Sequence, residues 1–110
     1  MSTKNIKASF SASSTILNGQ TAGSSVEVSN TVRGVVLCPS GFDGTAIKWD
    51  VSDDGATWFR LFSGGSAVST TVSATQAAEI PAGAMAGRFM RPVAATAQTG
   101  DSTLSFSLSF

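Results

Sequence analysis

The strongest constraint on the fold is a strict alternation of apolar residues and serine at the C-terminal end of the sequence. The apolar positions are Leu104, Phe106, Leu108 and Phe110, and the serines between them are Ser105, Ser107 and Ser109. A period of two places successive side chains on opposite faces of a β-strand. The segment therefore predicts a strand with one apolar face and one uncharged polar face.

Similar patterns recur along the chain, with Gly, Pro, Asn or Asp interrupting them about every 8–12 residues. The predicted strands are residues 6–12, 26–28, 34–38, 46–51, 57–62, 68–72, 77–80, 88–93 and 104–110. Residues 81–86 (PAGAMA) predict one helical turn at most. We therefore predict an all-β fold: a single antiparallel β-sandwich or barrel of about eight short strands, with little or no helix. Residues 1–110 are expected to form one domain, with the first few residues able to form an extended arm.

Three local patterns make more specific predictions. Residues 34–38 (GVVLC) are mostly apolar, which favours a central strand buried on both sides. Pro92 cannot donate a backbone hydrogen bond, so its strand is expected at an edge or at a bulge. The two chain ends, ASFSAS and SFSLSF, resemble each other and are expected to pair as neighbouring strands.

The charge composition argues against nucleic acid and membranes as partners. Seven acidic and seven basic side chains give a formal charge of zero, and only 13% of residues are charged. Such a chain has no net field to attract an anionic polymer or lipid surface, and it resists self-association poorly. Serine and threonine occupy most outward strand positions, and another protein can cover them at low desolvation cost. A homo-oligomer, with a trimer as the favoured state, is the expected form.

Composition also removes most catalytic chemistry. The chain has no His and no Tyr, and its single cysteine, Cys38, lies in an apolar run. Nucleophile–histidine pairs and an internal disulfide are therefore excluded, and one Cys without His cannot build a structural zinc site. We expect no enzyme activity and no cofactor. Neither a signal peptide nor a membrane-spanning run is found in the sequence, and folding in a reducing cytoplasm is expected.

The only acidic cluster is Asp50, Asp53 and Asp54, in the stretch VSDDGATWFRLF. Aspartate oxygens are suitable calcium ligands, which makes the three residues a weak calcium candidate. Their spacing matches no twelve-residue calcium loop. A hairpin tip is favoured, because Asp and Ser side chains accept backbone hydrogen bonds and Gly55 tolerates positive φ.

Several large side chains are candidates for an interface. Trp49 is expected in the core, whereas Trp58 fits either the core or an interface. Isolated arginines among Ser and Thr can bind a carboxylate or phosphate on a partner, although solvated edge charges are the more common role. The interface candidates are Trp58, Arg60, Arg88, Arg91, Phe106 and Phe110.

Five short motifs carry a resemblance to a known group of proteins. They are GQT (19–21), VVLCP (35–39), FDGT (42–45), SDDGATW (52–58) and RFMR (88–91). In this order they resemble small tailed-bacteriophage virion proteins, in patches from residue 16 to residue 93. The resemblance implies a β-sandwich or barrel module that serves as capsid cement or decoration, or as a neck or tail accessory.

The leading expectation is therefore a virion structural protein that binds itself and the major capsid protein. Neck or tail accessory proteins are the first alternative. The second alternative is a glycan-binding β-sandwich for host attachment, in which an exposed Trp58 beside Asp53 and Asp54 would stack on a sugar.

Overall fold

The computed structural model describes residues 9–110, so residues 6–8 of the first predicted strand and the expected arm lie outside the described residues. The longer strands are β1 (Ser9–Ile16), β3 (Arg33–Leu37), β4 (Ala46–Ser52), β10 (Phe89–Ala94) and β11 (Ser102–Ser109). The shorter ones are β2 (Val26–Glu27), β5 (Phe59–Arg60), β6 (Phe62–Ser63), β7 (Ser66–Ala67), β8 (Ser69–Thr71) and β9 (Ala77–Glu79). The predicted all-β class is confirmed.

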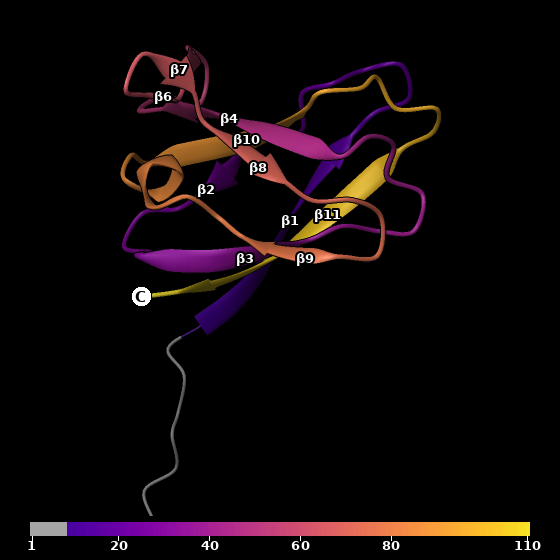
Figure 1. The fold of residues 1–110 in the computed structure, drawn as a ribbon. Coiled ribbons are helices and arrows are strands. Elements are labelled where there is room, and N and C mark those ends of the chain that lie inside the picture. The colour runs from indigo at the N-terminus through magenta and orange to yellow at the C-terminus, as the bar shows by residue number, and fades with distance from the viewer. Residues whose placement is uncertain (1–8) are drawn as a thin grey trace, which may run out of the picture.

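Two antiparallel sheets form a β-sandwich (Figure 1). Sheet A has the strand order β1-β11-β3-β9. Sheet B has the order β2-β10-β4-β5, and β8 also pairs with β4. The predicted pairing of the chain ends is confirmed, because β1 and β11 are in register along their full length, from Ser9 opposite Ser109 to Ile16 opposite Ser102.

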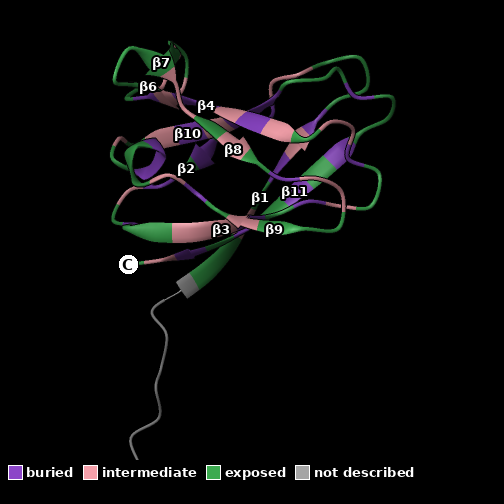
Figure 2. Cartoon of the chain, in the orientation of Figure 1, coloured by how far each residue is buried: buried purple, intermediate pink, exposed green. Residues whose placement is uncertain are grey.

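The core lies between the sheets and follows the predicted alternation. Leu104, Phe106 and Leu108 are at most 1% exposed, and β11 is accordingly banded in buried and exposed colours in Figure 2. The rings of Trp49 from β4 and Phe106 from β11 are 6.4 Å apart across the sandwich. Trp49 is a core residue, as expected, and its indole N–H donates to the hydroxyl of Thr70 at 3.0 Å. The interface expectation for Phe106 needs correction, because even-numbered residues of β11 face the core.

The strand predicted to be buried on both sides is β3, and this prediction is wrong in part. It is central in sheet A, between β11 and β9. Val36 is fully buried, but Leu37 is 43% exposed. Nothing in the described chain covers the outer face of sheet A, so only one face of β3 is in the core.

Pro92 was expected at an edge or at a bulge, and it lies in β10, which is a central strand. Around Pro92 the pairing of β10 goes from Met90–Val26 to Val93–Ala22 with one extra residue on the partner segment, as at a bulge. The carbonyl of Pro92 accepts from the N–H of Gly23 at 2.8 Å, so the backbone of Pro92 faces a loop and not a strand. The pairing of β10 with β2 ends at Met90, two residues before Pro92. The missing N–H of proline therefore costs no ladder bond. A Cβ on Gly23 would collide with Oγ of Ser14 and would also lie 3.0 Å from Cγ of Pro92, which explains a glycine at this contact.

The predicted strand 57–62 is broken in the structure. β5 pairs with the last part of β4 and β8 with its first part. Between them, the β6–β7 hairpin projects from the sheet, with Gly64 and Gly65 at positive φ at its tip (Figure 1). Leu61 packs against the core, whereas Phe59 is 64% exposed.

Helical structure is limited to the 3₁₀ turn η1 (Ala82–Met85) within the described residues, as predicted for PAGAMA. Ala84 and Met85 of this turn are buried. No helix that the structure describes has the length and apolar character to cross a membrane.

Candidate functional site

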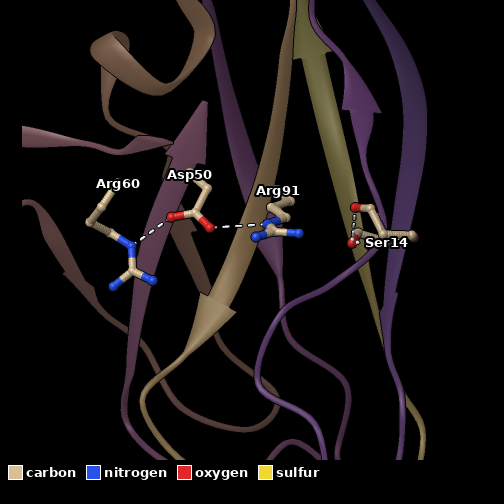
Figure 3. Close-up of polar contacts among 5 residues, drawn as sticks. Ser14, Asp50, Arg60 and Arg91 are labelled. Atoms are coloured by element: carbon tan, nitrogen blue, oxygen red, sulfur yellow. Dashed lines mark hydrogen bonds and ion pairs between the residues drawn. The ribbon is translucent and has the colours of Figure 1, made fainter. Parts of the chain in front are cut away.

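A row of three charged side chains crosses the outer face of sheet B. Arg91 of β10 and Arg60 of β5 are both paired with Asp50 of β4 in the strand register. Nε of Arg60 donates to Oδ1 of Asp50 at 2.6 Å, and Nε of Arg91 donates to Oδ2 at 3.0 Å (Figure 3). Residues directly opposite in antiparallel strands share a face at close distance. The register itself therefore builds this charge row.

The charge row has one buried anion and two partly exposed cations. The side chain of Asp50 is 6% exposed, and those of Arg60 and Arg91 are 37% and 28% exposed. Each oxygen of the buried carboxylate has one charged donor, as a buried charge requires. Both arginines use Nε, and in residues 9–110 neither donates to a second protein acceptor. Their terminal N–H groups can therefore donate hydrogen bonds to a carboxylate or carbonyl oxygen of a partner.

Trp58 lies beside the charge row. Cζ of Arg91 is 4.5 Å from the centroid of the Trp58 ring, which is a close cation–π contact. The Trp58 side chain is half-buried on the outer face of sheet B, and Trp58 precedes Arg60 by two residues in the chain. The sequence left Trp58 open between the core and an interface, and the structure places Trp58 outside the core.

The acidic hairpin tip is held by its own side chains. Oγ of Ser52 accepts from the N–H groups of Asp54 and Gly55 at 3.2 and 2.9 Å. Oδ1 of Asp54 accepts from the N–H groups of Ala56 and Thr57, both at 2.8 Å. These backbone hydrogen bonds lower the pKa of Asp54 to about 2. Gly55 has φ of +78°, as the turn requires.

The three aspartates proposed as a weak calcium candidate have separate partners. Asp50 is bound by two arginines on the sheet face, Asp54 holds the turn, and Asp53 is exposed. Within residues 9–110, no three His, Cys, Asp or Glu side chains are grouped so as to hold a metal ion. The structure therefore does not bring Asp50, Asp53 and Asp54 together as one ligand set.

The remaining interface candidates lie apart from the charge row. Arg88 is exposed, with its guanidinium 5.5 Å from the ring centroid of Phe89. Phe110 is 56% exposed at the end of the β1–β11 pair. Cys38 is buried, and this burial raises the pKa of its thiol, which disfavours the reactive thiolate.

Sequence reasoning missed two organising residues, Asp50 as the anion of the charge row and Gln98. Gln98 is 2% exposed, and its amide group fills all four of its hydrogen-bonding positions. Nε2 donates to the carbonyls of Asp43 and Thr96 at 3.0 and 2.9 Å, and Oε1 accepts from the N–H of Asp43 and the hydroxyl of Ser102. An amide in a polar loop gives no pattern that would have indicated this role.

Comparison with known proteins identified no relative of this chain. No family model, curated protein or solved structure matches the chain. Function has therefore to be inferred from the surfaces of the sandwich. These are the charge row with Trp58 on sheet B, and the outer face of sheet A.

Proposed function

We propose that this protein is a bacteriophage virion structural protein, and specifically a capsid cement protein. In this role it folds in the host cytoplasm, binds the major capsid protein and other copies of itself, and stabilises the shell through these contacts. The resemblance of residues 16–93 to small tailed-phage virion proteins supports the proposal, as does the zero formal charge.

One observation carries the proposal: the outer face of the β1–β11 pair, which forms one side of sheet A, is a continuous uncharged hydroxyl surface. Its serines and threonines are opposite each other in the register, and we call these residues the hydroxyl face. They are Ser11, Ser13, Thr15, Thr103, Ser105, Ser107 and Ser109. All are exposed or half-buried, and the hydroxyls of Thr15 and Thr103 are 2.9 Å apart. Covering β1 and β11 desolvates no charge on these two strands, which suits a permanent contact with another protein. The charges of this sheet face, Arg33 and Glu79, lie beyond them on β3 and β9.

The charge row supplies a second, directional contact. A flat hydroxyl face gives area but little orientation. The two guanidinium groups of Arg60 and Arg91 present planar donors that fix the direction of an incoming carboxylate. In a symmetric shell, many copies of a modest contact of this kind add up to strong retention.

The direct test is to purify the particle and identify its proteins. A copy number in the hundreds is expected of a cement protein on a shell. A copy number of about a dozen or fewer would instead indicate the neck or tail, and absence from the particle would contradict every structural role.

A second test asks whether the hydroxyl face makes the contact. Particles lacking this protein are mixed with purified variants, and bound protein is quantified after sedimentation. Ser105→Glu adds a charge to the hydroxyl face and is expected to abolish binding. Ser69→Glu makes the same change at an exposed position of β8 in sheet B and is the matched control. Equal binding of both variants would show that the hydroxyl face is not the docking surface.

A further inference from the structure

Strand β1 has an unpaired edge over its first half. It pairs with β11 on one side only. At Thr15, the N–H donates to Oγ of Ser24 and the carbonyl accepts from the N–H of Ser24, so these groups face away from β11. Backbone groups alternate in direction along an antiparallel strand, and those of Ser13 and Ser11 therefore face the same way. Unlike Thr15, these two residues meet no backbone partner on that side within residues 9–110.

The other sheet edges of the described chain are short or interrupted. β9 has three residues and carries Glu79, and β2 has two and carries Glu27. The edge formed by β5 and β8 is broken by the projecting β6–β7 hairpin. Charges, short strands and interruptions are the features that keep edges from pairing with another chain. β1 is eight residues long and contains neither a charge nor proline.

An exposed aromatic pair lies at this same unpaired edge. Phe10 is 37% exposed and Phe110 is 56% exposed, and their ring centroids are 5.4 Å apart. Phe10 is opposite the buried Leu108, so both rings continue the apolar face of sheet A past the end of the core. The start of β1 and the C-terminus lie side by side at one end of the sandwich in Figure 1.

The local sequence at this edge is complementary to itself. Residues 9–13 read SFSAS, and the reversed order SASFS differs only by exchanging Phe10 and Ala12. If two copies align antiparallel with Ser11 opposite Ser11, each Phe10 is opposite Ala12 of the other copy. A large side chain then meets a small one at a pair whose backbones approach closely. The two Phe10 rings are diagonal neighbours, with Cα atoms roughly 7–8 Å apart, within reach of aromatic contact.

We propose that two copies of this chain pair through antiparallel β1 strands about a two-fold axis at Ser11. Pairing joins the two A sheets into one continuous sheet with about six new backbone hydrogen bonds at residues 9–13. It also aligns Phe110, Phe10 and their copies in one aromatic row. The sequence favoured a trimer, and the mass of the free protein distinguishes that state from this two-fold dimer. It goes beyond the proposed virion role, because it concerns the free protein and is tested without a particle.

The test is a charge exchange at Phe10, read by sedimentation analysis of the purified full chain. The unchanged protein is expected to have the mass of a dimer. Phe10→Lys and Phe10→Glu each place like charges together at the axis and are expected to weaken dimerisation at least about tenfold. An equimolar mixture of the two variants is expected to restore the dimer, which also shows that both variants fold.

Two further variants define the surface. Ser11→Pro removes an edge N–H that faces away from β11, and it is expected to give a folded monomer. Phe62→Lys changes a phenylalanine with 59% exposure in β6 and is expected to leave the dimer unchanged. A monomeric unchanged protein, a dimer that persists in Phe10→Lys alone, or a mixture that fails to restore pairing would each overturn the proposal.

Discussion

Asp50 and Arg91, 41 residues apart in the chain, meet on the outer face of sheet B, where Nε of Arg91 is 3.0 Å from Oδ2 of Asp50. Arg60 binds the other oxygen of the same carboxylate at 2.6 Å. The carboxylate thus separates two guanidinium groups that would otherwise face each other. Removing only the anion leaves two neighbouring positive charges without compensation, which is the costly way to break such a cluster.

Replacement of Asp50 by alanine is expected to lower the free energy of unfolding by about 2 kcal/mol, measured by urea denaturation. The value is below that of a fully buried ion pair, because both arginines are about one-third exposed and water screens them. Asp53→Ala, at the exposed hairpin tip, is the matched control and is expected to leave stability nearly unchanged. An equal loss for both variants would mean that the charge row contributes no special stability.

Arg91 is expected to protect Trp58 from small quenchers. Arg91→Ala removes the guanidinium that lies 4.5 Å from the ring centroid, and so acrylamide quenching of the indole fluorescence should increase. Trp49 is fully buried and gives a constant background. Arg88→Ala removes the equivalent stacking on Phe89 and is expected to leave quenching unchanged. Unchanged quenching in Arg91→Ala would contradict the cation–π contact.

The same measurement bears on the glycan-binding alternative. A sugar that stacks on Trp58 has to displace Arg91 from the ring, so Arg91→Ala should strengthen saccharide-dependent quenching if this alternative holds. Quenching by saccharides that is absent in both the unchanged protein and the variant would remove Trp58 as a reason for a glycan-binding role.

Local patterns predicted the fold class because each strand carries its own period-two signal. The β1–β11 pair, the buried Trp49 and the Ser52–Gly55 tip were all readable in this way. Which strands lie next to each other in a sheet could not be predicted from these local patterns. For Pro92 the sequence left an edge or a bulge open, and it could not decide between them, because nothing in it indicates where β2 ends.

The site was predictable only as a set of residue types. Arg60 and Arg91 were identified as candidates, but Asp50 was assigned to the turn because its nearest acidic neighbours lie there. Its true partners depend on the register of β4 with β10 and β5, a long-range property that local spacing does not contain. Phe106 and Phe110 share one pattern, yet one is in the core and one is exposed, since the core ends between them.

The hairpin tip is expected to lose stability in acid. The pKa of Asp54 is about 2 in the folded protein, against an ordinary value of 3.8, because the backbone N–H groups of Thr57 and Ala56 favour the carboxylate. A lowered folded pKa stabilises the protein above pH 3.8, and this contribution is lost as the pH falls from 3.8 toward 2.

Asp54→Asn should therefore flatten the dependence of stability on pH between 4 and 2. Asparagine keeps an oxygen that accepts the same two N–H bonds, so the turn still forms. Carboxyl NMR of the unchanged protein should give Asp54 a titration midpoint of about 2. A midpoint near 3.8 would show that Asp54 does not hold the turn.

Gln98 is expected to be the most sensitive polar residue of the loops. Replacement by alanine leaves the part-buried N–H and carbonyl of Asp43 and the buried hydroxyl of Ser102 without their partner, and we expect a loss of about 2–4 kcal/mol in urea unfolding. Gln98→Glu retains the acceptor but cannot donate to the carbonyls of Asp43 and Thr96, and it should cost nearly as much. Gln76→Ala loses one exposed hydrogen bond and is the matched control. Similar losses at both positions would contradict a special role for the buried amide.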